Sequence, residues 1–238
     1  MVPHSNATRS VCPNKRLTLI DAFKAGFLPA FFMASLPRLT RPFASKSAIM
    51  PRPALIVRLA LWLWFAAAIA GGYYLLLQRL NPIALPVIIG GLAALALYLY
   101  FRLPGLRDWL DDISPLTLVQ LHLSRFFGAY FLFLFYRGDL PYAFAVPAGI
   151  GELIVAVLAL GLIAIRRDPV RQRHYLTRWN LIGLIDIILV TVSAARIYAA
   201  HPPQLRALTH LPLSLLPLFL FPLLIATHVM IFARLLRR

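Results

Sequence analysis

Charged residues are scarce in this 238-residue chain, and acidic residues are the scarcest. Only 13% of the residues are charged, with 24 Lys and Arg against 8 Asp and Glu, for a net charge of +16. Soluble domains carry about 25% charged residues and roughly half apolar ones, whereas 61% of this chain is hydrophobic and its mean hydropathy is +0.77. A water-soluble globular protein is therefore excluded. Disorder is excluded because it requires low hydrophobicity, and no nucleic-acid partner is expected, because nucleic-acid-binding proteins place their cations on an otherwise polar surface.

Cysteine is almost absent, and no recognisable catalytic motif is present. The single Cys12 excludes an internal disulfide and a cysteine-based metal cluster. The sequence contains no HExxH, no GxSxG, no phosphate-binding loop and no pair of aspartate-rich motifs that could hold magnesium diphosphate. We therefore nominate no catalytic residue and no metal site, and the sequence favours a protein that is not an enzyme.

Long apolar runs dominate what is present. A helix needs about 20 mostly apolar residues to cross a bilayer, and six segments qualify: 57–78, 83–101, 116–136, 142–164, 179–199 and 211–233. The links between several of them are short and contain turn-forming residues, so successive helices must run antiparallel. The sequence predicts an all-α polytopic membrane protein, an up-down bundle of about six transmembrane helices that forms one domain over residues 57–234.

The positions of Lys and Arg predict the orientation, because cytoplasmic segments are enriched in these residues. Alternate polar segments, beginning with the N-terminal one, hold 19 Lys and Arg, and the segments between them hold three, Arg79, Arg137 and Arg206. Both termini are therefore expected in the cytoplasm, with the protein in a bacterial inner membrane. The basic stretch 166–178 is expected to lie against anionic lipid headgroups. The oligomeric state is left open.

Residues 1–50 form a basic N-terminal segment with a less coherent pattern. Residues 17–36 are apolar, but they contain Asp21 and Lys24 and have Pro29 near their middle. No signal-peptide cleavage site is evident. We expect this segment to be partly disordered or to form an amphipathic helix on the inner leaflet. The alternative is that translation starts at Met50, which opens a normal first span.

Four charged residues fall within the predicted spans, where each costs about 2.5–3.5 kcal/mol at the bilayer centre. They are Arg125 in the third span, Glu152 in the fourth, and Asp186 and Arg196 in the fifth. Such residues face the interior of a helical bundle and are the places to look for function. At a rise of about 1.5 Å per residue, Arg196 falls near the outer surface and the other three lie deeper.

Two histidines join the three deeper charges in a candidate binding cluster. The helical rise places His122, Arg125, Asp186 and His228 in one layer of the inner half of the bilayer, with Glu152 about one turn above it. His122 and Arg125 are three residues apart and share a helix face. We expect Arg125 to be the counter-ion of Asp186 or Glu152, and His122 with Asp186 is a candidate pair.

The fourth span carries a candidate helix-break motif directly before Glu152. Pro147 removes a backbone donor, and Gly149 and Gly151 weaken the helix further. Broken helices at the membrane midplane expose backbone groups, which transporters use to hold ions and substrates. The alternative is a simple packing kink. The last span, with Pro212, Pro217 and Pro222, repeats the pattern, and there the packing kink is the better interpretation.

Three interpretations of the cluster follow from the residues. In the leading one, the cluster lines a polar cavity that binds or passes a small solute or a proton, and protonation of a carboxylate alters its pairing with Arg125. In the second, the protein is a membrane-embedded enzyme or a b-type haem protein with His122 and His228 as axial ligands. In the third, the cluster only fixes helix packing in a structural or assembly subunit. The leading interpretation requires no cofactor.

Four stretches of the chain resemble a group of uncharacterised bacterial multi-pass inner-membrane proteins. These stretches are RFFG, LPYAFAVPAGIGE, WNLIGLID and the Pro-rich last helix with its His, all within about the last 120 residues. The group carries RxxG, then LPxxFAxPAGxG followed by an acid, then NxxGxxD. The resemblance falls on Arg125, Gly128, Pro147, Gly149, Gly151, Glu152, Asn180, Asp186 and His228. The group's pattern has Asp at the position of Glu152, which keeps the charge, and no activity comes with the resemblance.

Overall fold

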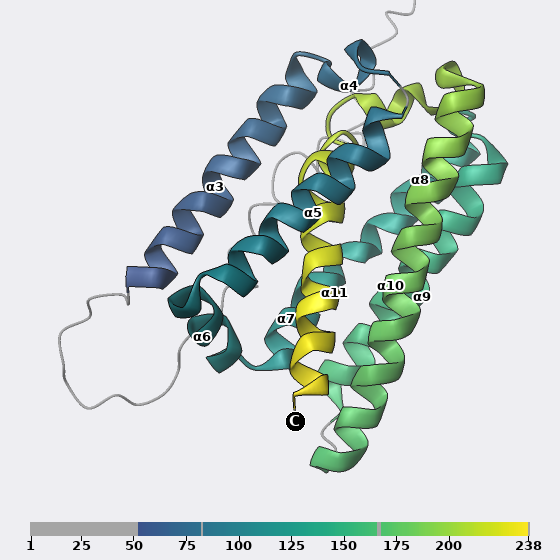
Figure 1. Cartoon of the computed structure of the whole chain (residues 1–238). Coiled ribbons are helices and arrows are strands. Elements are labelled where there is room, and N and C mark those ends of the chain that lie inside the picture. Colours follow the sequence, from purple (N-terminus) through teal and green to yellow (C-terminus); the bar gives the residue numbers. More distant parts are fainter. Residues whose placement is uncertain (1–51, 82, 166–167, 238) are drawn as a thin grey trace, which may run out of the picture. The chain divides into compact units, whose positions relative to one another are not determined.

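The structure is a computed structural model that describes residues 52–81, 83–165 and 168–237. Every regular element in these residues is helical, and six helices are long and apolar enough to cross a membrane (Figure 1). The predicted all-α architecture with six membrane-length helices is therefore confirmed. The expectations for residues 1–50 lie outside the described residues.

The first two membrane-length helices are α3 and α5, and the third is interrupted. Their bounds, with the short helices between them, are α3 Arg52–Tyr73, α4 Leu76–Arg79, α5 Ala84–Arg102 and α6 Pro104–Asp112. The third crossing is built from α7 Pro115–Leu121, η2 His122–Phe127 and α8 Gly128–Tyr136. The remainder consists of α9 Tyr142–Ala164, α10 Pro169–Ala200, η3 Pro202–Thr209, η4 Leu216–Leu220 and α11 Phe221–Leu236.

Four boundaries differ by five residues or more from those predicted. The first helix begins at Arg52 rather than at residue 57. The first helix ends at Tyr73 because Leu75 adopts a left-handed conformation with φ 53°. The fifth begins ten residues earlier than expected, at Pro169, where the Asp168 side chain accepts a hydrogen bond from the Arg171 amide. The last begins at Leu216 rather than at residue 211, because residues 211–214 form turns before the π-helical η4.

The helix α10 is longer than a bilayer requires. Its 32 residues span about 48 Å at 1.5 Å per residue, whereas the hydrocarbon core is about 30 Å thick. The extra length lies at its N-terminal end, which carries Arg171, Arg173 and Arg178. An apolar window finds only the part of such a helix that lies in the membrane, which explains the late predicted start.

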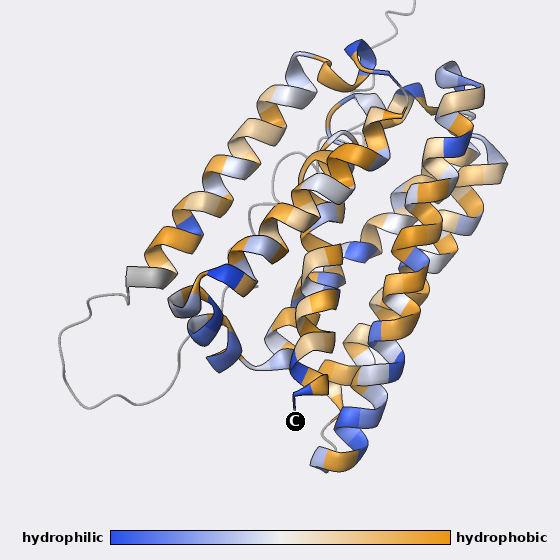
Figure 2. Ribbon diagram, viewed as in Figure 1, coloured by the Kyte–Doolittle hydropathy of each residue, from blue (hydrophilic) through white to orange (hydrophobic). Residues whose placement is uncertain are grey.

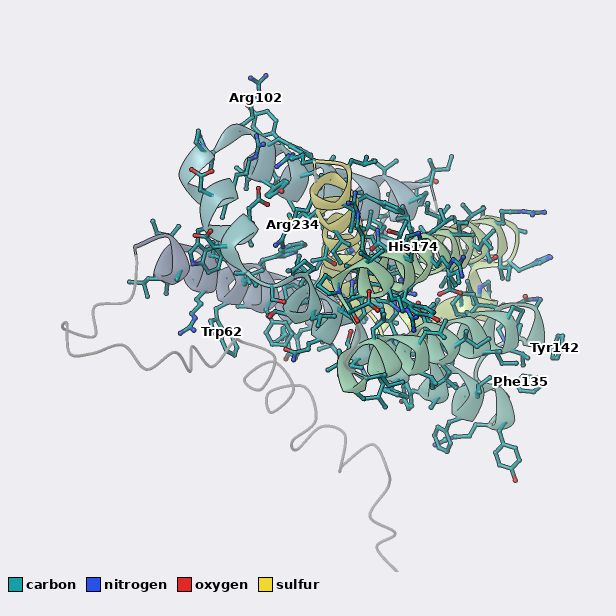
Figure 3. The ribbon with its side chains drawn as sticks, turned by 90° about the horizontal axis from the view of Figure 1, so that it is seen from below. Trp62, Arg102, Phe135, Tyr142, His174 and Arg234 are labelled. Atoms are coloured by element: carbon teal, nitrogen blue, oxygen red, sulfur yellow. The ribbon has the colours of Figure 1, made fainter. Side chains whose placement is uncertain are left out.

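The C-terminal helix is the most enclosed, and the first is the least. In α11 and the preceding η4, 67% of the apolar window is buried, against 11% in α3. Figure 1 shows α11, in yellow, between α5 and the α9–α10 pair. The long helices are apolar over most of their length, and polar residues gather at their ends and on α6 (Figure 2). Seen from below in Figure 3, Trp62, Phe135 and Tyr142 lie at the periphery, and all three are exposed.

Two apolar clusters fill the interior at different heights. One contains Leu176 and Trp179 of α10, and the other contains Ile187 and Val190 of the same helix. The part of α10 between them contributes the buried polar Asn180, and no fully buried apolar side chain of this part belongs to either cluster. A polar layer is thus enclosed between two apolar ones, and this layer holds the predicted binding cluster.

A separate polar contact ties α6 to the end of α11. The carboxylate of Asp111 accepts a 2.7 Å hydrogen bond from the Tyr100 hydroxyl and lies 3.1 Å from Nη1 of Arg237. It also lies 3.8 Å from Nε of both Arg107 and Arg234. Arg234 is buried (Figure 3) and donates to the carbonyl oxygen of Asp111 itself at 2.9 Å. The carboxylate of Asp111 thus forms ion pairs with three guanidinium groups, two of which belong to the end of α11 and the residue after it.

Candidate functional site

The third crossing changes its helix type where the site begins. Residues 122–127 form a 3₁₀-helix between two α-helical parts. Three residues per turn place His122 and Arg125 directly above one another, and both side chains are fully or almost fully buried. Within a membrane span, a 3₁₀ stretch often marks a functional hinge or local strain. The local geometry therefore directs both polar side chains into the interior.

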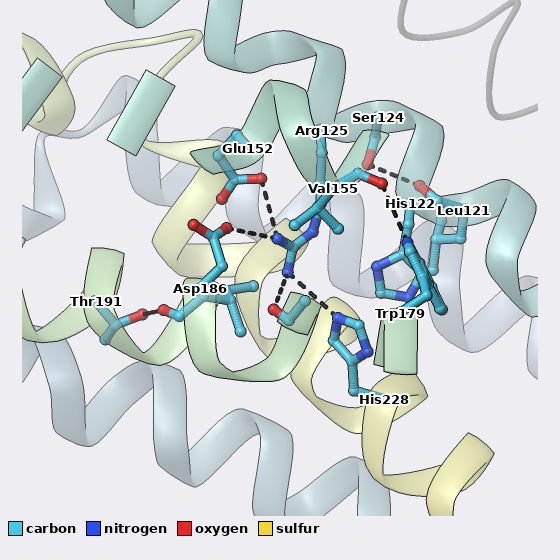
Figure 4. A network of polar contacts seen from close by, with 12 residues as sticks. Leu121, His122, Ser124, Arg125, Glu152, Val155, Trp179, Asp186, Thr191 and His228 are labelled. Carbon is cyan, nitrogen blue, oxygen red and sulfur yellow. Dashed lines mark hydrogen bonds and ion pairs between the residues drawn. The ribbon is translucent and has the colours of Figure 1, made fainter. Parts of the chain in front are cut away.

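The guanidinium of Arg125 is the centre of the site (Figure 4). Its Nη1 lies 2.8 Å from Oδ2 of Asp186 and 3.5 Å from Oε2 of Glu152. Its Nη2 donates to the Gly183 carbonyl oxygen at 2.9 Å and lies 3.3 Å from Nε2 of His228. The structure thus brings four of the five predicted residues into direct contact, and Arg125 faces both carboxylates that the sequence proposed as its counter-ions.

The hydrogen bonds of His228 define its tautomer. A guanidinium can only donate, so Nε2 of His228 accepts from Arg125, and its proton must sit on Nδ1. That atom lies 2.8 Å from Oδ1 of Asn180, whose amide nitrogen donates to the backbone carbonyl of His228 at 3.0 Å. His228 is therefore a neutral ring with both nitrogens engaged, and α10 and α11 are joined by a closed pair of hydrogen bonds.

The fifth predicted residue, His122, lies beside the ion pairs and does not contact Asp186. Its Nε2 is 3.1 Å from the hydroxyl of Thr227, which itself donates to the Leu224 carbonyl at 2.9 Å. Thr227 therefore accepts from His122, whose Nδ1 is left without a hydrogen-bond partner. The expected pairing of His122 with Asp186 is wrong, because the His122 ring packs against Trp179 and His228 and its Nε2 reaches Thr227.

The glycines near the site permit close helix contacts. A Cβ atom added to Gly128 would lie 2.5 Å from the Gly149 carbonyl oxygen, and one on Gly149 would lie 2.8 Å from the Gly128 carbonyl oxygen. A Cβ on Gly151 would overlap Oδ1 of Asp186. These glycines let the backbones of α8 and α9 touch and let the Asp186 carboxylate pack directly on α9.

The expected break in the fourth span is not found. The helix α9 runs without interruption from Tyr142 to Ala164, with Pro147 inside it. Pro147 lies in the second turn, where it removes one backbone hydrogen bond without interrupting the helix, and the neighbouring glycines are accommodated by packing rather than by unwinding. The Pro147–Gly149–Gly151 motif therefore brings helices together. The irregular backbone occurs instead in η2 and η4.

The charges of the site do not balance within the protein. Two carboxylates face one guanidinium, and the hydrogen bonds of His228 are those of a neutral ring. A proton on Nδ1 of His122 would be buried without an acceptor, so this ring is neutral as well. Three buried polar atoms of the site have no hydrogen-bond partner: Oε1 of Glu152, Nε of Arg125 and Nδ1 of His122. Buried polar groups are nearly always satisfied, so these three atoms are exceptions within the described residues of the site.

The two histidines do not suit axial ligation of a haem. Their ring centroids are 4.2 Å apart, and the rings touch each other directly. Axial ligands lie on opposite faces of the macrocycle, which must pass between them. The Nε2 atoms of both rings are also engaged, with Thr227 and Arg125. The haem alternative is therefore not supported, and in the described residues no group of three or more His, Cys, Asp or Glu side chains could hold a metal ion.

Some members of the site are not evident from a search for charges. Thr227 completes the His122 contact and is polar and buried within a predicted span, which is a signal that could have singled it out. The Gly183 carbonyl cannot be found this way, because every residue has one. Arg196, the fourth intramembrane charge, is exposed on α10. Whether the cluster binds anything stays a prediction.

Comparison with known proteins assigns the chain to one family, whose description gives no activity. The model of the family described as "Domain of unknown function (DUF8737)" matches residues 82–236, a stretch that contains the whole site. No curated protein and no solved structure matches the chain.

Proposed function

The chain belongs to the family described as a domain of unknown function (DUF8737), and from the geometry of its site we propose a function. The protein is a multi-pass membrane protein that reversibly binds a proton at Glu152 within the membrane. The observation that carries this proposal is that Glu152 and Asp186 share one nitrogen of one guanidinium. The proposal makes no use of a cofactor.

The charge balance supports a proton as the bound species. With both carboxylates ionised, the cluster has a net charge of −1 between two apolar layers. An uncompensated charge within a membrane costs about 2.5–3.5 kcal/mol even on insertion scales. One proton on one carboxylate removes this charge and leaves a neutral cluster with a single strong ion pair.

The contacts favour Glu152 as the residue that carries the proton. Asp186 lies 2.8 Å from Nη1 and accepts a hydrogen bond from it, whereas the ion pair of Glu152 with the same atom is longer, at 3.5 Å. Glu152 is also the more buried of the two, at 4% side-chain exposure against 16% for Asp186. Its Oε1 has no hydrogen-bond partner. The carboxyl with the weaker ion pair and the drier surroundings is the one that binds a proton most readily.

Release of the proton would change the contacts between helices. An ionised Glu152 competes with Asp186 for Nη1 of Arg125, which also holds the Gly183 carbonyl and His228. The competing groups lie on α9 and α10, and Arg125 lies on η2. Proton binding is thereby linked to the packing of three crossings, and this is how the site would pass a proton or couple it to a solute.

We extend the proposal to orientation and lipid contact. Both termini lie in the cytoplasm of a bacterial cell, and Arg171, Arg173 and Arg178 on the protruding end of α10 face anionic lipid headgroups of the inner membrane. The lone Cys12 offers a direct test. A membrane-impermeant maleimide should label Cys12 only after cells are opened, and labelling of intact cells would contradict the orientation.

Proton binding is tested by counting protons in the full chain held in lipid nanodiscs. Between about pH 6 and pH 9, wild type should bind roughly one proton more than Glu152→Gln, since the amide cannot titrate. Glu152→Asp is the matched control, which keeps a carboxyl group and should keep the proton. Equal counts in wild type and Glu152→Gln would contradict the proposed function.

A further inference from the structure

Asp186 is the one charged member of the cluster that reaches the surface of the helices. Its side chain is 16% exposed, whereas those of Arg125 and Glu152 are 0% and 4% exposed. The carboxylate packs on α9 at Gly151, where a Cβ atom would overlap Oδ1. The exposed edge of the carboxylate therefore lies in the seam between α9 and α10.

The seam is lined by exposed apolar side chains. On α9, Ile150 and Ile154 flank Gly151 and are 47% and 50% exposed. On α10, Ile182 and Leu189 lie one turn to either side of Asp186 and are 45% and 60% exposed. Exposed isoleucines in the middle of membrane-length helices face lipid. The edge of a carboxylate thus opens toward the hydrocarbon core.

The chemistry of this opening selects the class of ligand. Two carboxylates and one guanidinium repel an anion, and a neutral molecule leaves their excess charge in place. Among the described residues no group of three or more His, Cys, Asp or Glu side chains could hold a metal ion, and the guanidinium of Arg125 at the site repels a divalent cation more strongly than a monovalent one. A monovalent cation with an apolar body satisfies both the charge and the isoleucine-lined approach.

We propose that a lipophilic monovalent cation enters laterally between α9 and α10 and binds Asp186 in place of the proton on Glu152. This inference rests on the proposed function, because the cation and the proton neutralise the same excess charge. Oε1 of Glu152, buried and without a hydrogen-bond partner, is the second acceptor available to such a ligand. An ammonium head would contact the two carboxylates, and its alkyl chain would lie along the seam.

Competition between the cation and the proton follows from the groups that face Asp186. These are Arg125 from η2, which contacts Asp186 directly, and Glu152 from α9, which shares the same guanidinium nitrogen. His228 from α11 contacts the other side of that guanidinium, and the ring of His122 contacts His228. Arg125 stays charged and both histidines are held neutral, so only the carboxylates can exchange a proton. Binding of one cation should release about one proton, and affinity should increase as the pH rises.

The experiment uses three probes of equal chain length on the full chain in nanodiscs. Calorimetry should detect saturable binding of octylammonium, and neither octanol nor octanoate should show it above the level of empty nanodiscs. A pH-sensitive dye should record about one proton released for each octylammonium bound. Binding of all three probes, or of none, would overturn the inference.

Two variants on α10 distinguish entry of octylammonium through the seam from a general effect of adding a tryptophan to the lipid-facing surface. Ile182→Trp places a large side chain in the seam one turn from Asp186, and we expect octylammonium binding to weaken at least about tenfold. Ile188→Trp changes an equally exposed isoleucine about 200° around the helix from Asp186, and it should bind like wild type. Equal effects of the two variants would contradict lateral entry.

Asp186→Asn should abolish octylammonium binding, and Ile182→Trp keeps the test decisive if the loss of Asp186 impairs folding. The proton count of Ile182→Trp should remain that of wild type, because Ile182 is 45% exposed and neither side chain can titrate. In wild type, a normal proton count without octylammonium binding would defeat this inference and leave the proposed function standing. Loss of the Glu152 proton itself would defeat the proposed function.

Discussion

The Nη2 atom of Arg125 lies 3.3 Å from Nε2 of His228. Because the guanidinium can only donate, this contact holds His228 as a neutral acceptor and places its proton on Nδ1. The same guanidinium faces both carboxylates. The ion pairs and the histidine are therefore parts of one hydrogen-bonded unit. Protonation of one carboxyl group changes the contacts that Arg125 makes with α9, α10 and α11.

The tautomer of His228 can be tested through its other partner. Asn180→Leu removes the acceptor of the Nδ1 proton and the donor to the His228 carbonyl. Leaving these buried groups unsatisfied should cost about 1–3 kcal/mol of stability. Nitrogen-15 NMR should show His228 protonated at Nδ1 and His122 at Nε2 in wild type. The opposite tautomers would contradict the assigned hydrogen bonds. Asn81→Ala is the control for the stability measurement, because it removes a side-chain hydrogen bond at an exposed turn and should cost less than Asn180→Leu.

Removal of the Arg125 guanidinium should strongly destabilise the folded protein. Arg125→Gln leaves two buried carboxylates facing no cation, and breaking a buried ion pair costs about 3–5 kcal/mol. Adding Asp186→Asn to Arg125→Gln should recover most of this loss, because one carboxyl group can then take a proton and no ion remains. Thermal unfolding in detergent measures the stability of the single and the double variant. Additive losses in the double variant would show that the two residues do not act as a pair.

The contact between Gly128 and Gly149 should tolerate no side chain. In Gly149→Ala, the new methyl group would meet the Gly128 carbonyl oxygen at 2.8 Å, and backbone cannot move aside cheaply. We expect a loss of about 1–3 kcal/mol. Gly161→Ala, in the same helix, meets nothing within 4 Å and should gain roughly 0.5–1 kcal/mol from helix propensity. Equal effects in the two variants would argue against close packing of α8 on α9.

The polar contact between α6 and α11 depends on one carboxylate. Asp111→Asn weakens the bonds to Tyr100, Arg234 and Arg237 together. Because Asp111 is partly exposed, solvent screens the ion pairs, and the expected loss is about 1–2 kcal/mol. Asp112→Asn, at the exposed neighbouring position, should be close to neutral. The comparison is made by thermal unfolding at low salt, and a loss that does not shrink when salt is added would contradict an ionic origin.

Composition and hydropathy were sufficient to predict the six long helices, because a bilayer demands long apolar segments whatever their packing. The same cost argument selected Arg125, Glu152 and Asp186, which the structure brings together. Prediction from sequence stops where the outcome depends on a neighbouring helix. Pro147 and the nearby glycines look alike in a broken helix and in a closely packed one, and only the Gly128 backbone distinguishes the two.

The histidine contacts show a second limit. Depth along a helix placed His122 and His228 in the same layer, but depth does not reveal which partner each ring reaches. Arg125 contacts the Asp186 carboxylate, whereas the His122 ring packs against Trp179 and His228 and reaches Thr227. The polar extension of α10 was missed for a different reason, since the residues beyond the membrane are not apolar and their helix depends on the cap at Asp168.

Glu152 is the one glutamate in the chain, so its carboxyl group can be observed alone by labelling glutamate with carbon-13. The side-chain carboxyl resonance of the full chain in nanodiscs reports whether this group carries a proton. We predict the resonance of a protonated acid at about pH 7, which changes to that of a carboxylate as the solution becomes alkaline. A carboxylate resonance throughout the range from about pH 6 to pH 9 would contradict proton binding at Glu152.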